Sequence, residues 1–258
     1  MKITIVGTGN VAFHLGKRLS EQGVEINQII GRNATKTVWL ADLLKTKSTT
    51  FGGKIDVSSD IFIMAVSDDA IEEVASDLSQ IIGNQLVVHT SGSISSTVLE
   101  PFFRNYGVFY PLQTFSIDSR PDFNNIPIFI HATPQYNLDI LRELGQNVST
   151  RVFPLSDEDR LTLHVAAVFV NNFVNHLFKI GSEIVSKNHL PFDILLPLIE
   201  ETVHKIQQNA PADMQTGPAK RGDNVTVEKH LAFLQKTAPQ YELLYTLLSI
   251  SINKNLKI

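Results

Sequence analysis

Two hydrophobic patterns alternate along the chain up to about residue 154. Short apolar runs with β-branched residues predict strands, and longer segments with apolar residues at helical spacing predict the helices between them. The predicted strands are Ile3–Val6, Glu25–Ile30, Ser48–Phe51, Ile61–Val66, Gln85–His89, Val108–Tyr110, Pro127–Ile130 and Arg151–Phe153. This alternation indicates an α/β Rossmann fold, a doubly wound parallel sheet.

After Pro154 the strand pattern ends and long helical segments follow. Ser156 and the acidic residues behind it are typical of a helix start. Helices are predicted at Arg160–Lys187, Pro191–Gln208 and Val225–Gln235 and after residues 237–240, with a loop at Asn209–Asp223. We therefore expect a dinucleotide-binding Rossmann domain at residues 1–154. An all-α domain at residues 155–258 is expected to contribute to substrate binding and to form a homodimer.

Composition narrows the class of protein. The chain has 258 residues, 43% of them hydrophobic, a net charge of −4 and no cysteine. The charge argues against nucleic acid as a partner, and the lack of cysteine excludes disulfides and thiolate metal sites. No apolar run approaches the ~20 residues that cross a bilayer, and the N-terminus enters a strand without a signal peptide. We expect a soluble, cytoplasmic protein without a membrane partner or a metal.

A strand, a glycine-rich turn and a helix open the chain. Gly7 permits the sharp turn, Gly9 lets the backbone approach a pyrophosphate, and Ala12 keeps the helix close to the strand. The free N–H groups at the helix start face that anion. The turn predicts dinucleotide contacts from Gly7, Thr8, Gly9, Asn10, Val11 and Ala12. The alternative is an ordinary strand–helix turn.

The end of the second strand predicts which dinucleotide binds. NAD sites usually carry a carboxylate there, but this strand ends in Gly31, Arg32 and Asn33. A guanidinium can stack on adenine and pair with a 2′-phosphate, and Thr35 and Lys36 could add donors. We therefore predict NADP(H) as the cofactor, with Arg32 and Asn33 in contact with it. The alternative is a surface arginine.

Three segments are expected to converge at the carboxyl ends of the strands, where ligands bind in such sheets. Cofactor contacts are predicted from Val66, Ser67, Asp68, His89 and Thr90, and substrate contacts from Ser91, Gly92, Ser93, Gln113 and Thr114. His89 could also donate a proton. Helix caps, polar turns and a half-buried histidine are the alternatives.

Polar residues of the helical half extend the candidate site. His164 and Asn171 share a face of an otherwise apolar helix, so both are candidate catalytic residues. Hydrogen bonds between helices are the alternative. Lys220 and Arg221 lie in a glycine-containing loop that could bind an anionic substrate, or simply connect two helices in solvent.

Three later motifs carry a resemblance to a known group: HTSGS at 89–93, YPLQTF at 110–115 and GPAKRGDNVTVEKHL at 217–231. The chain resembles bacterial Rossmann-like proteins whose C-terminal half is a domain of unknown function. They are assigned as NADP oxidoreductases by similarity to pyrroline-5-carboxylate reductases and deazaflavin-dependent NADP reductases. The resemblance covers essentially the whole chain. It implies a helical C-terminal domain of the 6-phosphogluconate-dehydrogenase type, which often dimerises.

Two departures limit what the resemblance implies. Related β-hydroxyacid dehydrogenases carry a lysine three residues after an asparagine, whereas Val174 follows Asn171 and Asn175 follows Asn172 at that spacing. The Ser-Pro-Gly-Gly loop of the proline-synthesis enzyme is also absent. The leading hypothesis is a dimeric NADPH-dependent reductase of a small ketone, imine or related acceptor. The alternatives are a non-catalytic NADP(H) sensor and a reductase that uses reduced deazaflavin.

Overall fold

The computed structural model describes residues 1–256, which form two compact units. The first unit is Met1–Val168, and the second begins at Phe169. The division falls later than the predicted domain boundary after residue 154, because the first helix beyond that point, α5 (Asp157–Ala167), belongs to the first unit.

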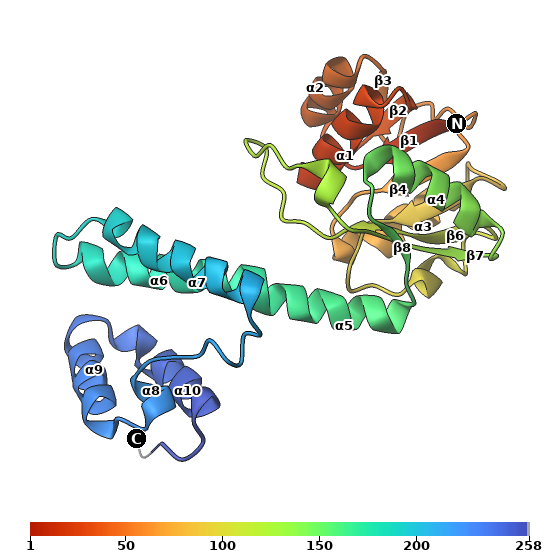
Figure 1. The fold of residues 1–258 in the computed structure, drawn as a ribbon. Helices are drawn as coiled ribbons and strands as arrows, with labels where there is room; N and C mark the ends of the chain where they lie inside the picture. The colour runs from red at the N-terminus through yellow and green to blue at the C-terminus, as the bar shows by residue number, and fades with distance from the viewer. Residues whose placement is uncertain (257–258) are drawn as a thin grey trace. The chain divides into compact units, whose positions relative to one another are not determined.

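The first unit is built around one eight-stranded sheet (Figure 1). Its strands are β1 (Lys2–Val6), β2 (Glu25–Ile30), β3 (Lys47–Thr49), β4 (Ile61–Met64), β5 (Leu86–His89), β6 (Tyr106–Pro111), β7 (Ile128–Thr133) and β8 (Val152–Pro154). They lie in the order β3-β2-β1-β4-β5-β6-β7-β8. All eight strands were predicted, with ends that differ by a few residues, and the Rossmann fold is confirmed.

The last two strands depart from the predicted all-parallel sheet. β7 pairs with β6 in antiparallel register, and β8 runs parallel to β7. A parallel β7 would need a crossover connection, usually a helix. The segment between β6 and β7 contains only a single 3₁₀ turn, η3 (Phe123–Asn125), so the chain turns back beside β6. The carboxyl ends of β1 to β6 therefore share one edge of the sheet.

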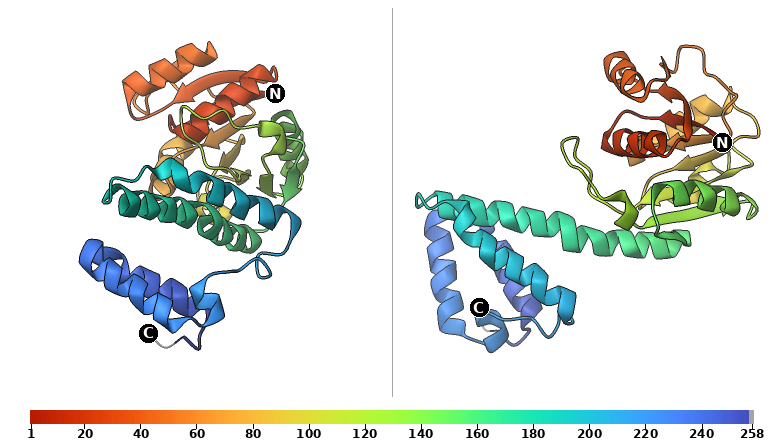
Figure 2. Two further views of the ribbon diagram at one scale, coloured as in Figure 1. Left: turned by 60° about the vertical axis from the view of Figure 1, so that its left-hand side comes forward. Right: turned by 45° about the horizontal axis from the view of Figure 1, so that its top comes forward.

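Helices cover both faces of this sheet, as the two ribbon views show (Figure 2). They are α1 (Asn10–Glu21), α2 (Ala34–Leu44), α3 (Ile71–Ser79) and α4 (Asn137–Val148), with short 3₁₀ turns η1 (Asp68–Ala70) and η2 (Ser96–Leu99). Along β4, Ile61 and Ile63 belong to the core cluster that includes α1, α2 and α4. Phe62 and Met64 belong to the cluster with α3. The alternation explains why central strands read as continuous apolar runs.

A helical run from Asp157 to Ser186 links the two units. It consists of α5, a π-helical segment η4 (Val168–Phe173) and α6 (Val174–Ser186). The predicted uninterrupted α-helix was therefore wrong in its middle. Ser156 caps the start as predicted, since its hydroxyl oxygen accepts a hydrogen bond from Asp159 N at 3.1 Å.

Beyond this run, the part of the second unit that the structure describes contains only helical elements and their connections. Its elements are η5 (Phe192–Leu195), α7 (Leu196–Gln208), α8 (Pro218–Arg221), α9 (Asn224–Thr237), η6 (Pro239–Tyr241) and α10 (Glu242–Ile252). The predicted loop at Asn209–Asp223 thus contains a short helix, α8. Pro218 begins it and Gly222, with φ 69°, ends it in the left-handed conformation.

The run Asp157–Ser186 is also long and apolar enough to cross a membrane by length and composition. Its 18-residue window has a mean hydropathy of 1.3, and none of the window is buried in the described chain. The expectation that no apolar run approaches this length was wrong. A single helix of this kind does not identify a membrane protein, because helices of other proteins meet the same criterion.

Candidate functional site

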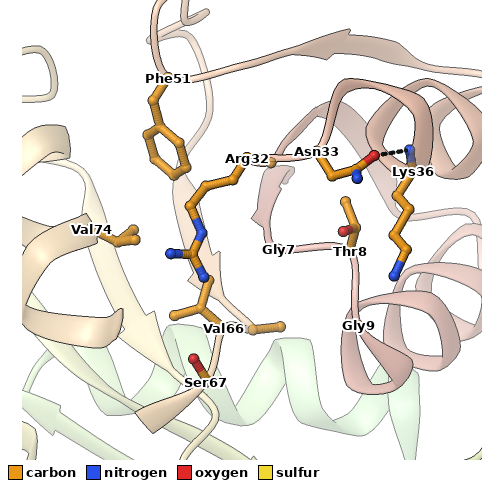
Figure 3. A pocket seen from close by; sticks show the side chains of 12 residues that line it. Gly7, Thr8, Gly9, Arg32, Asn33, Lys36, Phe51, Val66, Ser67 and Val74 are labelled. Atoms are coloured by element: carbon orange, nitrogen blue, oxygen red, sulfur yellow. Dashed lines mark hydrogen bonds between the residues drawn. The ribbon is translucent and has the colours of Figure 1, made fainter. Parts of the chain in front are cut away.

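A cavity of about 260 Å³ lies where β1, β2 and β4 end (Figure 3). Its lining comes from the glycine turn, the segment after β2 and the segment after β4. The residues are Gly7, Thr8, Gly9, Gly31, Arg32, Asn33, Lys36, Phe51, Ala65, Val66, Ser67 and Val74. Seven of the predicted cofactor contacts, Gly7, Thr8, Gly9, Arg32, Asn33, Val66 and Ser67, are brought together here.

The two glycines of the turn are required for different reasons. Gly7 has φ 124°, and a Cβ at this position would lie 2.7 Å from the carbonyl carbon of Ala65. Gly9 has no atom within 4 Å of the position that a Cβ would take, although the residue lines the cavity. Gly7 therefore shapes the backbone, whereas the bare Gly9 leaves open space beside the first N–H groups of α1.

Cationic side chains border this cavity. The Arg32 side chain extends among Phe51, Val66 and Val74, and the Lys36 amine points toward Gly9 (Figure 3). Asn33 holds the start of α2, because its side-chain oxygen accepts a hydrogen bond from Lys36 N at 3.0 Å. Open backbone at a helix start together with an arginine and a lysine fits the phosphates of a dinucleotide.

The other predicted cofactor contacts lie outside this lining. Asn10 Nδ2 donates to the carbonyl of Phe115 at 2.8 Å, which turns its amide toward the segment after β6. Ala12 is fully buried in the core, and Val11 is packed against it. Thr90 N donates to the carbonyl of Met64 at 3.2 Å. The side chains of Asn10, Val11 and Ala12 and the backbone of Thr90 are thus engaged in the fold, while the N–H groups of Asn10, Val11 and Ala12 are the first of α1.

A second cluster forms at the carboxyl ends of β5 and β6. The Tyr110 hydroxyl, on β6, lies 3.0 Å from His164 Nδ1, on α5. Both rings pack on Gly92, where a Cβ would lie 2.7 Å from Tyr110 Cζ and 2.8 Å from His164 Cγ. Burial raises the pKa of Tyr110 to about 12, so its phenol keeps the proton at neutral pH.

The hydroxyl groups beside Gly92 hold the turn and a carboxylate. Ser91 Oγ accepts hydrogen bonds from Ser93 N at 3.1 Å and Ile94 N at 3.0 Å. Ser93 Oγ donates to Asp68 Oδ2 at 2.6 Å and so connects the segments after β4 and β5. The predicted polar-turn alternative therefore describes Ser91 well, while Ser93 and Asp68 form an exposed hydrogen-bonded pair.

The structure does not support His89 as a proton donor. The side chain has no exposed surface, and Nδ1 accepts a hydrogen bond from Ser91 N at 3.2 Å. Burial, followed by the charge of Arg160, lowers the pKa of His89 to about 4. Its Nε2 is buried without a hydrogen-bond partner among the described residues. A neutral, enclosed imidazole of this kind supports the loop above it.

The remaining site predictions fall on exposed positions. Gln113 and Thr114 are exposed after β6, and Gln113 Oε1 accepts a hydrogen bond from Thr114 N at 2.8 Å. Asn171 belongs to the second unit and is exposed in η4 of the single chain. Lys220 and Arg221, also in the second unit, are exposed at the end of α8.

Three residues escaped the sequence reasoning about the site. Tyr110 was seen only as the start of a turn motif, and its pairing with His164 joins positions 54 residues apart. Asp157 and Arg160 looked like ordinary charges at a helix start, yet Arg160 is 1% exposed. A buried arginine indicates a structural or functional role, but its burial cannot be predicted from a single sequence.

Two family models match the chain. Residues 2–92 match the family described as "NADP oxidoreductase coenzyme F420-dependent". Residues 126–252 match "Domain of unknown function (DUF2520)". No sequence among the curated proteins matches.

Solved structures of oxidoreductases are also similar to this chain. A "putative NADP oxidoreductase" from Bacteroides fragilis is 37% identical over 98% of each chain, with a TM-score of 0.92. An imine reductase from Myxococcus stipitatus in complex with NADP+ is 15% identical, with a TM-score of 0.66 over 99% of this chain and 96% of that one. A pyrroline-5-carboxylate reductase from Coxiella burnetii is 15% identical, with a TM-score of 0.58 over 99% and 98%. The last two show the fold alone.

The fold and the cavity define a Rossmann-type oxidoreductase with a helical C-terminal region. Within that class, the chain belongs to the family of the Bacteroides fragilis protein, in which an NADP-oxidoreductase domain precedes a DUF2520 domain. The resemblance predicted from the HTSGS, YPLQTF and GPAKRGDNVTVEKHL motifs is confirmed.

Proposed function

We propose that this protein is an NADP(H)-dependent reductase of a small ketone, imine or related acceptor. The observation that carries the proposal is the Tyr110–His164 pair, packed on Gly92 at the same sheet edge as the dinucleotide cavity. Family membership supports oxidoreductase chemistry, and the Bacteroides fragilis relative is described as an NADP oxidoreductase. The acceptor class comes from the remote imine and pyrroline-carboxylate reductases and stays a proposal.

The coenzyme site is assigned to the cavity beside Gly9. The first N–H groups of α1 and the open space at Gly9 would receive the pyrophosphate, and Arg32 and Lys36 would pair with a 2′-phosphate. The same cavity shows no acidic residue in its lining within the described chain, whereas NAD sites commonly place one on the ribose. When bound, NADPH supplies the hydride.

His164 is the proposed proton donor. Reduction of a C=O or C=N bond breaks its π bond, adds hydride to carbon and adds a proton to oxygen or nitrogen. The imidazolium would donate Nδ1–H to the Tyr110 hydroxyl oxygen, give its Nε2 proton to the acceptor and be left as the neutral imidazole. Because the pKa of Tyr110 is raised to about 12, the tyrosine serves to orient the imidazole and is a poor acid itself.

Substrate contacts are proposed from Ser93, next to Gly92 in the same loop, and from the predicted residues Gln113 and Thr114 of the first unit. We also propose that the helical region forms a homodimer. Its support is a set of exposed apolar side chains along η4, including Phe169, Val170 and Phe173, which are 62%, 74% and 50% exposed. Apolar surface of this kind marks an interaction site.

A spectrophotometric screen tests the proposal. NADPH oxidation by the purified protein is followed with keto acids, aldehydes and cyclic imines, and NADPH affinity is measured in parallel. Turnover of one acceptor class, lost in His164→Gln while NADPH affinity is retained, is the expected result. Tight NADPH binding with no turnover of any acceptor would instead identify a non-catalytic sensor. Turnover only with reduced deazaflavin would identify the third possibility.

A further inference from the structure

We propose that Asp157 and Arg160 are positioning residues that fasten the Ser91–Ser96 loop to α5 and thereby set His164 against Gly92. The inference rests on the proposed function, in which His164 is the proton donor. It adds a pair of residues that do not line the coenzyme cavity.

Asp157 binds the loop with one carboxylate oxygen. Its Oδ2 accepts hydrogen bonds from Ser95 Oγ at 2.6 Å, Ser96 N at 2.8 Å and Ser96 Oγ at 2.8 Å. The other oxygen, Oδ1, pairs with Arg160 Nη1. Three donors and one guanidinium on a single side chain exceed what a helix cap needs, because Ser156 already caps α5.

Arg160 completes the attachment from the same helix. Its Nη2 donates to the carbonyl of Ile94, while Nη1 holds Asp157. The side chain is 2% exposed, so its charge is separated from water and depends on these partners. Asp157 compensates that charge, and its own pKa is lowered to about 2 by hydrogen bonds from Ser95, Arg160 and Ser96 against the opposing effect of burial. The pair is therefore ionised at neutral pH.

The contact that Arg160 makes with the loop lies one helical turn from His164, the proposed donor. Arg160 and His164 are four residues apart on α5 and so lie one above the other on one face. On the loop, Ile94 binds Arg160 and Gly92, two residues earlier, receives the His164 ring. Two contacts one helical turn apart fix both the distance and the rotation of α5 against the loop. Loss of the first contact should let His164 shift at the second.

A double-mutant cycle tests this coupling. The single-turnover rate of NADPH oxidation, and the KM for NADPH, are measured for wild type, Arg160→Met, His164→Gln and the double variant. We expect Arg160→Met to slow the rate by about 10- to 100-fold with KM unchanged within about twofold, since small misplacements of catalytic groups cost this much. In the His164→Gln background the same substitution should change the rate by less than about twofold.

The chain supplies a matched control. Asp139 and Arg142 form an ion pair at the same i, i+3 spacing on α4, but their side chains are 84% and 39% exposed. Arg142→Met should leave the rate unchanged. Equal losses from Arg160→Met in both backgrounds, or no loss, would overturn the inference while the reductase function stands. Should Arg160→Met not fold, Arg160→Lys is used in the same cycle, because it keeps the charge opposite Asp157 but not the planar fork.

A second measurement does not depend on turnover. Hydrogen exchange of the peptide that covers residues 90–99 should accelerate in Arg160→Met and not in Arg142→Met, because the Ser96 amide is bonded to Asp157. Unchanged exchange in that peptide would also overturn the inference. A wild-type protein that binds NADPH and reduces no acceptor would instead refute the proposed function, and the exchange result would then stand by itself.

Discussion

At the scale of single residues, the site depends on one missing side chain. Gly92 has only a hydrogen where a Cβ would press on His164 and Tyr110, so the two rings can close over the loop. Tyr110 then engages Nδ1 of His164 at 3.0 Å, which leaves Nε2 for the proposed proton transfer. The same logic applies at Gly9, where the missing side chain leaves room for a ligand. At Gly92 the missing Cβ makes room for two rings, and at Gly9 it leaves open space beside the start of α1.

Gly92→Ala should therefore displace the pair. The added methyl cannot fit without movement of His164 or Tyr110, so we expect a fall in the rate of acceptor reduction of about tenfold or more. NADPH affinity should be unchanged. Gly83→Ala is the control, because a Cβ there meets only the end of Gln85 at 3.9 Å. A fully active Gly92→Ala enzyme would remove the pair from the mechanism.

Arg32→Ala tests the choice of coenzyme. Loss of a charged hydrogen bond to the 2′-phosphate should weaken NADPH binding by about 10- to 100-fold and leave NADH binding nearly unchanged. Titration calorimetry with both coenzymes measures the difference. Arg104→Ala removes an exposed arginine that does not line the cavity and should change neither affinity. Equal losses for the two coenzymes would contradict the assignment of Arg32.

At the scale of elements, most strands and helices of the Rossmann unit could be predicted from the sequence, but few of the contacts that assemble its site could. The strands are legible because central ones such as β4 and β5 are buried on both faces and read as apolar runs. The antiparallel direction of β7 could not be predicted, because it follows from the absence of a crossover helix in the long polar segment before it. The contacts of Arg160 are out of reach too, because Ile94 lies 66 residues earlier.

The π-helical segment η4 illustrates another limit. Its apolar residues follow helical spacing, and it contains neither proline nor glycine, so nothing in its pattern distinguishes it from an α-helix. It also carries Asn171, which the sequence places on one face with His164 and which is exposed. Exposure here depends on what packs on the helix, and one chain's sequence does not state that.

The end of β5 predicts a pH-dependent stability. The folded-state pKa of His89, about 4, lies below its ordinary value of 6.5, so the unfolded chain takes up a proton first as the pH falls. Stability from this residue is fully present above pH 6.5 and is lost between 6.5 and 4, by up to about 3 kcal/mol. The difference in free energy of unfolding between wild type and His89→Gln, measured with urea, should fall by that amount from pH 7 to pH 4. A difference that does not change with pH would contradict the assignment. As a control, His204→Gln, at an exposed position, should show the same pH dependence of unfolding as wild type.

At the scale of the whole molecule, two compact units divide within η4, and apolar side chains on that segment are exposed. We predict a homodimer through the helical region. Sedimentation velocity should give a dimer mass for wild type and a lower mass for Phe173→Asp. Val38→Asp, which changes an exposed apolar residue of the first unit, should leave the mass unchanged. A monomeric wild type at micromolar concentration would contradict the dimer.

The proposed reaction uses two sites of the first unit, the coenzyme cavity at Gly9 and the proposed proton donor His164. Single-turnover oxidation of bound NADPH by the best acceptor tests it most directly, in wild type, His164→Gln and Tyr110→Phe, with coenzyme affinity measured on the same samples. We predict unchanged affinity, a rate loss of about 10²- to 10⁴-fold in His164→Gln and a smaller loss in Tyr110→Phe. Wild-type rates in His164→Gln would contradict it.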